Sequence, residues 1–423
     1  MSSTNIRFSN FASSIRVETA FSVLAVAKRL KAEGKDVIEL EIGDSPFATP
    51  AVAVEAGTRA IQDGLTRYGP SLGLPEFRAA AAAYVNREYG LTVTAANVVA
   101  GQGAKIFEQL FCEAFLNPGD GVLVFSPHFP TYPPNIERRG ARVVLSRLSP
   151  ARDFRPDPGE VRRFVREDPS PRAVFINSPH NPTGGVATLE DFQAIADLLR
   201  GTDIVVFSDE PYDRMVWKGR HHSPLEVPGM IERTVAAYTF SKSFSMSGWR
   251  LGFAIGAPAT IDMLGKLTNT TLSCVPPFVQ MAGIAALEKA RDDRDRSMKE
   301  FHRKVELLVA ALGRVEGITC AMPVGSFYAF PSVAGVCNRL GITSHGLAMY
   351  LLEGADLKRG VACLGGECFG EAGAGFLRLS CAEPDDRLAS AVEFIAEAVT
   401  RRDRVTAYVA EHPEYRLAGE YGN

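Results

Sequence analysis

The sequence lacks the features that would mark a membrane, nucleic-acid-binding or disulfide-stabilised protein. No stretch of its 423 residues reaches the roughly 20 consecutive apolar residues that a membrane-spanning helix needs. The seven cysteines are odd in number and scattered, which favours a reducing compartment over a disulfide framework or a zinc site. The net charge of −3 gives no general attraction to nucleic acid or to an anionic lipid surface. We therefore expect a cytoplasmic protein without nucleic-acid, membrane or metal partners, whose anion-binding sites are local.

The chain is long enough to bury a large core. With 46% hydrophobic and 22% charged residues, it has the composition of a globular protein. A chain of this size usually divides into two or more domains of roughly 100–200 residues each. The apolar run Phe21–Ala27 is too short for a signal segment, and we interpret it as about one and a half turns of a helix.

Short β-branched runs alternate with amphipathic helical patterns along most of the chain. The runs are Val122–Phe125, Ala173–Ile176, Ile204–Phe207, Val235–Tyr238 and Phe253–Ile255. This alternation predicts an α/β fold with a mostly parallel sheet covered by helices. Nearly every run ends in polar or turn residues, and ligands of such sheets bind beyond the carboxyl ends of the strands. We expect the chemistry of the protein to lie at that edge.

Changes of pattern along the chain predict four segments. A helical pattern over 278–315 becomes heavily charged, which is typical of a helix that leaves the core and leads to a second unit. We therefore expect a large domain over 46–290 that carries the ligand site, and a small α+β domain over 291–400. The N-terminal segment 1–45 is expected to join the small domain. Residues 401–423 are polar without a convincing period, which predicts an extension packed on the surface.

The most informative segment is the run SKSFSMSGWR, which contains Lys242 and Arg250. A lysine among small hydroxyl and glycine residues, directly after an apolar run, can have its amine desolvated and directed into a cleft, where it is suited to forming a Schiff base. The arginine and the hydroxyls of Thr239 and Ser241 supply donors for a phosphate. A lysine beside a phosphate site indicates pyridoxal phosphate. A basic surface loop is the alternative, but the run has few other charges.

Two further turns follow predicted strands. Asn181 begins the sequence NPTG, and Asp209 begins DEPY. Taken alone, the first is typical of a simple turn and the second of a helix start. Together with Lys242 and Arg250, however, they change the interpretation. Through the patterns NPTG, SDEPY and SKSFSMSGWR, the sequence resembles the class I and II aminotransferases of the fold-type-I pyridoxal phosphate enzymes, over roughly residues 15–400.

The resemblance implies a fold and a set of catalytic roles. The sheet would have seven strands, with a smaller α+β domain beside it. Lys242 would hold the cofactor as a Schiff base, and its freed amine would then move the substrate Cα proton. Asp209 would pair with the pyridine nitrogen and keep it protonated. Asn181 and Tyr212 would donate hydrogen bonds to the phenolic oxygen of the ring.

The resemblance also implies how the cofactor is held. Its phosphate would be bound by Thr239, Arg250 and the backbone amides of Gly103, Ala104 and Lys105, at the N-terminus of a helix over 105–116. Phe129 would stack on the ring, although the residue alone is equally compatible with a place in the core. Tyr68 would reach the phosphate of a neighbouring subunit, which implies a homodimer with shared active sites.

The resemblance further implies how the substrate is held, in part by Arg378 and Gly43, which lie outside the large domain. Arg378 matches the arginine that grips the substrate α-carboxylate, although a strand arginine of this kind is often solvated. Gly43 and Asn181 would also contact the substrate. The segment 14–20 departs from the usual family pattern, and its acidic residue Glu18 argues against a preference for dicarboxylate substrates.

The sequence thus predicts an aminotransferase that moves an amino group between an L-amino acid and a 2-keto acid by a ping-pong mechanism. The first alternative is a C–S lyase, a cyclising synthase or an oxidase on the same fold. All these enzymes form the same substrate carbanion, and the residues of the pocket determine which product it gives. A regulator that has lost the chemistry is disfavoured by the retained Lys242, Asp209 and Arg250. A nucleotide-binding oxidoreductase is disfavoured because Gly101-Gln102-Gly103 lacks a third glycine at the dinucleotide spacing.

Overall fold

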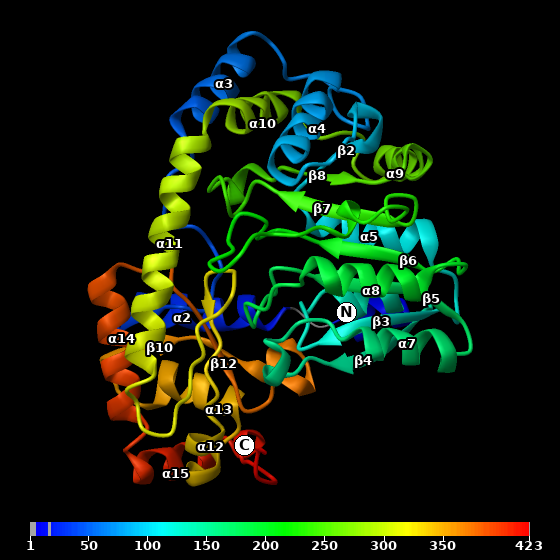
Figure 1. The fold of residues 1–423 in the computed structure, drawn as a ribbon. Coiled ribbons are helices and arrows are strands. Elements are labelled where there is room, and N and C mark those ends of the chain that lie inside the picture. The colour runs from blue at the N-terminus through cyan, green and yellow to red at the C-terminus, as the bar shows by residue number, and fades with distance from the viewer. Residues whose placement is uncertain (1–5, 16–17, 423) are drawn as a thin grey trace.

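A computed structural model describes residues 6–15 and 18–422 of the chain. A large α/β unit and a smaller α+β unit are joined by the long helix α11 (Arg291–Leu312), which runs from one to the other (Figure 1). The predicted N-terminal segment includes residues 1–5 and 16–17, and the predicted extension includes residue 423; these positions lie outside the described residues.

The large unit is built on a seven-stranded sheet with the order β2-β8-β7-β6-β5-β3-β4. Its strands are β2 (Val98–Gly101), β3 (Gly121–Ser126), β4 (Arg142–Arg147), β5 (Pro171–Asn177), β6 (Val205–Asp209), β7 (Thr234–Thr239) and β8 (Gly252–Ile255). Strands β3 to β7 pair in parallel with one another, whereas β8 is antiparallel to both β7 and β2. This is the mostly parallel, seven-stranded α/β sheet that the sequence predicted.

The sheet is covered by helices on both faces, because successive side chains of each buried strand point to opposite sides. On β3, Val122 and Val124 pack in one core cluster, while Leu123 and Phe125 pack in another. The first cluster lies under α5 (Lys105–Phe115), α6 (Tyr132–Glu137) and α9 (Pro258–Thr271). The opposite face is covered by α7 (Pro158–Glu167) and α8 (Leu189–Leu199), and beyond them by α3 (Ala51–Gln62), α4 (Pro75–Tyr89) and α10 (Pro277–Lys289). The result is a three-layer α/β/α unit.

The small unit contains two short sheets. One pairs β1 (Asp36–Glu39) in parallel with β10 (Arg359–Ala362), and the other has the antiparallel order β11 (Leu364–Gly365), β12 (Leu377–Ser380) and β9 (Tyr328–Ala329). Its helices are α2 (Thr19–Ala32), the second half of α11, α12 (Ala334–Leu340), α13 (Ser344–Met349), α14 (Asp385–Ala398) and α15 (Arg402–Glu411), and α1 (Asn10–Ser14) precedes α2. Side chains of α2 and β1 are buried in the same core cluster as those of β10 and β12.

Three local predictions differ from the structure. The apolar run at Phe21 is part of a 14-residue helix, α2. The residues after the run include Lys28, Arg29 and Lys31, so the local sequence does not indicate that the helix continues. The helical pattern over 278–315 is two helices, α10 and α11, which are separated at Ala290. The predicted surface extension contains α15, whose residues Val405, Tyr408 and Val409 are buried in the core of the small unit. Among the described residues, no helix is long and apolar enough to span a membrane.

Candidate active site

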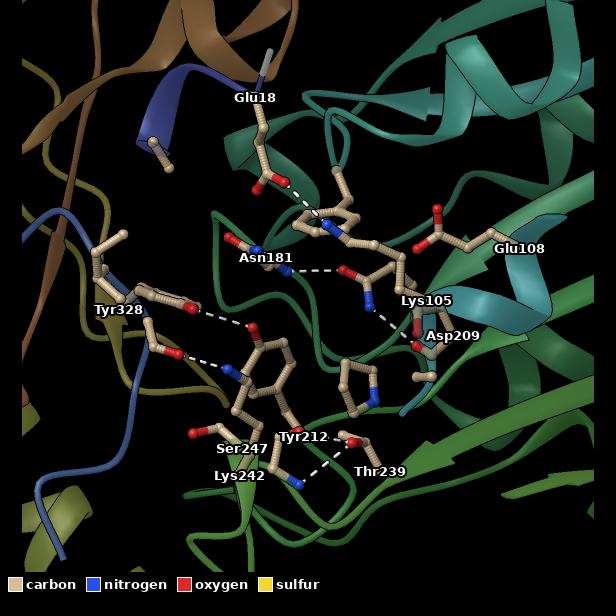
Figure 2. Close-up of a pocket in the computed structure, with 18 of the residues that line it drawn as sticks. Glu18, Lys105, Glu108, Asn181, Asp209, Tyr212, Thr239, Lys242, Ser247 and Tyr328 are labelled. Carbon is tan, nitrogen blue, oxygen red and sulfur yellow. Dashed lines mark hydrogen bonds and ion pairs between the residues drawn. The ribbon is translucent and has the colours of Figure 1, made fainter. Parts of the chain in front are cut away.

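A pocket of about 480 Å³ lies where the carboxyl ends of the sheet strands face the small unit (Figure 2). Its walls bring together residues that are far apart in the sequence: Glu18, Ala20, Phe21, Ile42, Gly43, Ala104, Lys105, Glu108, Phe129, Asn177, Asn181, Asp209, Pro211, Tyr212, Thr239, Ser241, Lys242, Ser247, Arg250, Tyr328 and Arg378. The pocket therefore has one wall from the large unit and one from the small unit and the N-terminal segment.

The parallel register of the sheet explains why several polar residues meet here. Asn177 at the end of β5 lies opposite Asp209 at the end of β6, and Asp209 lies opposite Ala237 of β7. The Asn177 side chain donates a hydrogen bond to the Asp209 carbonyl oxygen at 2.9 Å and accepts one from the backbone amide of Asn181 at 2.8 Å. The NPTG turn is thus tied to the strand ends, and it holds Asn181 against the pocket.

Lys242 lies in the loop that follows β7, with its side chain directed into the pocket. Its Nζ donates a hydrogen bond to the backbone carbonyl of Gly43, which comes from the opposite wall (Figure 2). Burial and, to a smaller extent, the nearby guanidinium groups of Arg378 and Arg250 lower the pKa of this amine to about 8, although Asp44 raises it. About a tenth of the lysine is therefore a neutral, nucleophilic amine at pH 7, far more than for an ordinary lysine.

Asp209 is a buried carboxyl group at the floor of the pocket, with 6% of its surface exposed. Its Oδ2 accepts a hydrogen bond from the hydroxyl of Tyr132 at 2.5 Å. Desolvation raises the pKa of Asp209 to about 6, because the Tyr132 hydrogen bond, which lowers it, compensates only in part. No ion pair of Asp209 is found among the described residues, so a cation that enters the pocket has an anionic partner there.

Hydroxyl and guanidinium donors gather at the end of the pocket nearest β7. Thr239 Oγ1 and Ser241 Oγ lie 2.9 Å apart, and Ser247 and Arg250 line the same end. Arg250 has a left-handed backbone conformation (φ 53°), and its Nη2 donates to the carbonyl of Gln102 at 3.1 Å. The N-terminus of the 11-residue helix α5 also opens here, where the first amides have no partner within the helix.

One of the three amides predicted to bind phosphate is already engaged. The backbone N–H of Gly103 donates to the carbonyl of Gly101 at 3.0 Å, and Gly103 does not line the pocket, whereas Ala104 and Lys105 do. Gly103 has a different importance: its φ is +82°, and a Cβ at this position would lie 2.8 Å from Nη2 of Arg250. A glycine is needed because the guanidinium packs against the backbone of this tight turn.

The opposite end of the pocket carries a second buried cation, Arg378, which is 4% exposed on β12. Its Nη1 donates to Asn181 Oδ1 at 3.1 Å, and its Nη2 donates to the backbone carbonyl of Glu41. Its Nε is buried without a hydrogen-bond partner, and no carboxylate pairs with it among the described residues. The side chain is therefore not the solvated strand arginine that the sequence also allowed, and it offers an unmatched positive charge to an anionic ligand.

The remaining predicted residues divide between the pocket and the surface. Phe129 lines the pocket with its ring 5.0 Å from the Lys105 ammonium. Gly43 lines it as well, and a Cβ there would lie 1.8 Å from the hydroxyl of Tyr328. Tyr212 is buried, and its hydroxyl lies 3.0 Å from that of Tyr328. Tyr68 is different: it is 90% exposed and lies outside the pocket of its own chain.

Sequence reasoning missed several residues of the pocket. Tyr328 lies beneath Arg378, whose guanidinium is 4.4 Å from the centre of the ring, and no local pattern marks it. Glu108 is a second buried acid of the pocket. Lys105 was assigned only a backbone role, yet its Nζ pairs with Glu18 Oε2 at 2.9 Å (Figure 2). Within the described part of the chain, no group of three or more His, Cys, Asp or Glu side chains is placed to hold a metal ion.

The pocket fits pyridoxal phosphate by the chemistry of its side chains. Its two ends carry donors for two anionic groups: hydroxyls, Arg250 and a helix N-terminus at one end, and Arg378 with its unpartnered Nε at the other. Between them lie an amine of lowered pKa and a buried carboxyl group without an ion-pair partner. This donor set suits a phosphate, an aldehyde, a ring nitrogen and a substrate carboxylate.

Comparisons with known proteins agree with this arrangement. The sequence matches the family described as aminotransferase class I and II over residues 35–395. It is 34% identical over 367 residues to an aspartate aminotransferase of Pyrococcus horikoshii, covering 86% of this chain and 91% of the relative. It is also 32% identical over 347 residues to an arginine–pyruvate transaminase of Pseudomonas aeruginosa, covering 82% and 86%.

A solved structure of the aspartate aminotransferase of Thermus thermophilus with maleate superimposes with a TM-score of 0.86 at 32% identity, over 93% of this chain and all of that one. These matches confirm the resemblance, the fold, the enzyme class and the cofactor that the sequence motifs predicted. The chain belongs to the class I and II aminotransferase family of fold type I, and it is a pyridoxal phosphate-dependent enzyme that transfers amino groups between amino acids and 2-keto acids.

Proposed function

We propose that the residues of the pocket divide the work of amino transfer among them, and that the enzyme acts on amino acids whose side chains carry no negative charge. Pyridoxal phosphate, when bound, supplies a reactive aldehyde and a ring that accepts an electron pair. Lys242 is the residue that holds the cofactor and moves the Cα proton. The observation that carries this assignment is the lowered pKa of its amine, about 8, inside a pocket that also holds a buried acid.

The other assignments follow from charge and position. The amine of Lys242, when neutral, accepts a proton from the substrate Cα, and its ammonium form returns a proton in the second half of the cycle. Asp209 keeps a negative charge against the ring nitrogen, and Tyr132 stabilises that charge by donating to Oδ2. Tyr212 and Asn181, which line the pocket, would donate hydrogen bonds to the phenolic oxygen of the ring, and Phe129 would stack on it.

Two anion-binding sites hold the cofactor by its phosphate and the substrate by its α-carboxylate. Thr239, Arg250 and the amides at the start of α5 hold the phosphate. Arg378 binds the substrate α-carboxylate, because its guanidinium is buried and its charge has no carboxylate partner in the described structure. Gly43 lies beside that carboxylate and lets Tyr328 pack closely against the backbone.

The substrate class rests on the ion pair between Glu18 and Lys105. Both residues line the pocket, and their charged atoms lie 2.9 Å apart. An unpaired Lys105 would attract the distal carboxylate of aspartate or glutamate, but Glu18 neutralises it and repels a second carboxylate. The apolar neighbours Ala20, Phe21 and Ile42 complete a wall that suits uncharged side chains. The names of the relatives, an aspartate aminotransferase and an arginine–pyruvate transaminase, indicate that this family accommodates side chains of either charge.

A panel of single amino acids tests this assignment. We expect neutral amino acids to convert the bound cofactor to its amino form fastest, with release of the matching 2-keto acid, and aspartate and glutamate to react slowly. The variant Glu18→Gln should raise the rate with aspartate about tenfold relative to a neutral substrate, since it frees the Lys105 charge at a partly exposed site. The matched control is Glu33→Gln. Glu33 follows the last residue of α2, is exposed, pairs with Arg29 and does not line the pocket.

Either of two results would contradict the proposal. Aspartate reacting faster than every neutral amino acid with the unaltered enzyme would show that Glu18 does not set the preference. Release of ammonia or a peroxide without a second keto acid would point instead to a lyase or oxidase on this fold.

We also infer a cytoplasmic homodimer with shared active sites. Tyr68 is 90% exposed, and the nearby apolar residues Val54, Ile61 and Leu65 are exposed as well, which suits a surface that a second copy covers. All seven cysteines are free thiols, which is typical of a reducing compartment. An equimolar mixture of a Tyr68→Ala chain and a Lys242→Ala chain should regain up to about a quarter of full activity, because about half of the dimers are mixed and one of the two sites in each of them is intact. A monomer in sedimentation analysis would contradict this inference.

A further inference from the structure

The pocket contains a second buried acid, Glu108, which the assignments above do not use. Glu108 lies on α5, is 1% exposed and lines the pocket on the same side as Asp209 (Figure 2). It forms no ion pair with any described residue, and the nearest cation, Lys105, is engaged with Glu18. An isolated charge at such a depth is costly, so a buried carboxyl group of this kind is usually either paired or neutral.

The hydrogen bonds of Glu108 have the pattern of a neutral carboxylic acid. Thr131 Oγ1 donates to Glu108 Oε2 at 2.6 Å, and Asn135 Nδ2 donates to the same oxygen at 3.2 Å. No described residue donates to Oε1. In a protonated acid the carbonyl oxygen accepts hydrogen bonds and the hydroxyl oxygen carries the proton, so two donors on Oε2 and none on Oε1 leave Oε1 available to carry that proton.

Asp209 has a single hydrogen-bond donor and is less deeply buried. Tyr132 donates to its Oδ2 at 2.5 Å, and Asp209 is 6% exposed against 1% for Glu108, so a negative charge costs less on Asp209 than on Glu108. The three donors Thr131, Tyr132 and Asn135 come from α6 and the residue before it, so this short segment serves both acids: two donors go to Glu108 and one to Asp209. Two carboxyl groups that share a site with little water do not both ionise.

We propose that Glu108 and Asp209 form a carboxyl pair in which Glu108 holds the proton, so that Asp209 is the charged member that faces the ring nitrogen of the cofactor. Glu108 is thus a positioning residue, which acts on the cofactor through the charge of Asp209. This inference rests on the role proposed for Asp209.

The groups around Glu108 support this distribution of charge. Desolvation, followed by the repulsion of Asp209, raises the pKa of Glu108 to about 8, and the Thr131 and Asn135 hydrogen bonds and the Lys105 ammonium offset only part of this rise. Tyr132 from α6 and the thiol of Cys112 one turn along α5 also face the acid, and both remain neutral because their own pKa values are raised. Glu108 is therefore protonated at neutral pH and loses its proton as the pH rises through about 8.

The test compares the apoenzyme forms of the unaltered protein, Glu108→Gln and Asp209→Asn. Glutamine keeps an oxygen for Thr131 and Asn135 and reproduces the neutral state. We therefore expect Glu108→Gln to bind pyridoxal phosphate at pH 7 with a Kd within about threefold of the unaltered protein, since it preserves both hydrogen bonds. Asp209→Asn should bind it about a hundredfold more weakly or worse, because a buried charge partner is lost.

Infrared spectroscopy gives a readout that needs no cofactor. The apoenzyme at pH 7 should show a carbonyl band of protonated carboxyl groups, with a component that fades above about pH 8, and Glu108→Gln should lose that component. Glu41, another buried acid whose pKa is raised to about 7, contributes a similar band, and Glu41→Gln identifies that contribution.

Three results would overturn the assignment of the proton to Glu108. A tenfold gain in cofactor affinity for Glu108→Gln would mean that Glu108 was the charged member, and a tenfold loss would mean that its negative charge is itself required. An unchanged infrared band in Glu108→Gln would overturn the proposal as well. If Asp209→Asn binds the cofactor normally, the role of Asp209 fails, while the infrared result still reports on Glu108 alone.

Discussion

Gly43 offers a sharp test of how the small unit is fitted to the active site. A Cβ at this position would lie 1.8 Å from the hydroxyl oxygen of Tyr328 and 2.8 Å from the ring carbon that bears it. Ordinary contacts begin near 3.4 Å, so in Gly43→Ala one of the two groups must move by about 1.6 Å. Tyr328 has little room to move, because its ring is buried beneath Arg378 and its hydroxyl bonds that of Tyr212 at 3.0 Å.

The cost follows from these contacts. Overpacking a tight core costs about 1–3 kcal/mol and the loss of the Tyr212–Tyr328 hydrogen bond about 1 kcal/mol, which together predict a destabilisation of about 2–4 kcal/mol. The same shift moves the backbone carbonyl that accepts from Lys242, so the affinity for pyridoxal phosphate should fall as well. Urea unfolding followed by circular dichroism, and cofactor titration of the apoenzyme, measure the two effects.

The matched control is Gly419→Ala. Gly419 has no atom within 4 Å of its hypothetical Cβ and no left-handed backbone, so an alanine there should be neutral or slightly stabilising. If Gly43→Ala is as stable as the control and binds the cofactor equally well, the close packing of Tyr328 against the backbone does not matter, and the reasoning is refuted.

Two further predictions concern the charge of Lys242 and the C-terminal helix. The rate at which the apoenzyme takes up pyridoxal phosphate should rise with pH and level off above about pH 8. The reactive form is the neutral amine of Lys242, and burial lowers the pKa of this amine to about 8. A rate that keeps rising beyond pH 10 would mean that Lys242 has the pKa of an ordinary lysine. Val405→Ala should destabilise the protein by about 1–2 kcal/mol through loss of buried methyl groups, whereas the neighbouring exposed Thr406→Ala should change stability by less than about 0.5 kcal/mol. If the two variants are equally stable in thermal unfolding, Val405 is not part of the core, and residues 401–423 are the surface extension that the sequence predicted.

The parts of the fold and site that the sequence predicted are those with a short-range signal. Five strands of the large sheet, β3 and β5 to β8, are short apolar runs, which is why these strands, the sheet type and the polar turns at Asn181, Asp209 and Lys242 were readable from the sequence. The edge strands β2 and β4 were not predicted as runs, and β4 is mostly exposed or half-buried. The exposed polar face of α15 hid its weaker apolar pattern at Val405, Tyr408 and Val409, so this helix was missed.

The parts that could not be predicted depend on contacts between distant segments. The alternation of apolar and polar residues around Arg378 is the same whether its side chain is solvated or buried. The side chain is buried because Tyr328 and Phe369, which are distant in the sequence or outside the strand, pack against it. The Glu18–Lys105 pair joins residues 87 positions apart, and nothing near either residue indicates the other. Nothing in the local sequence distinguishes Glu108 from an exposed helix acid, because its burial depends on contacts with α6.

The central claim is that the amine of Lys242 is the group that binds the cofactor covalently. Two lysines, Lys242 and Lys105, line the pocket, so the claim has a direct competitor. The enzyme loaded with pyridoxal phosphate is reduced with borohydride, digested and analysed by mass spectrometry to find the lysine that carries the cofactor. The account predicts modification at Lys242 alone; modification at Lys105, or at no lysine of the pocket, would contradict it.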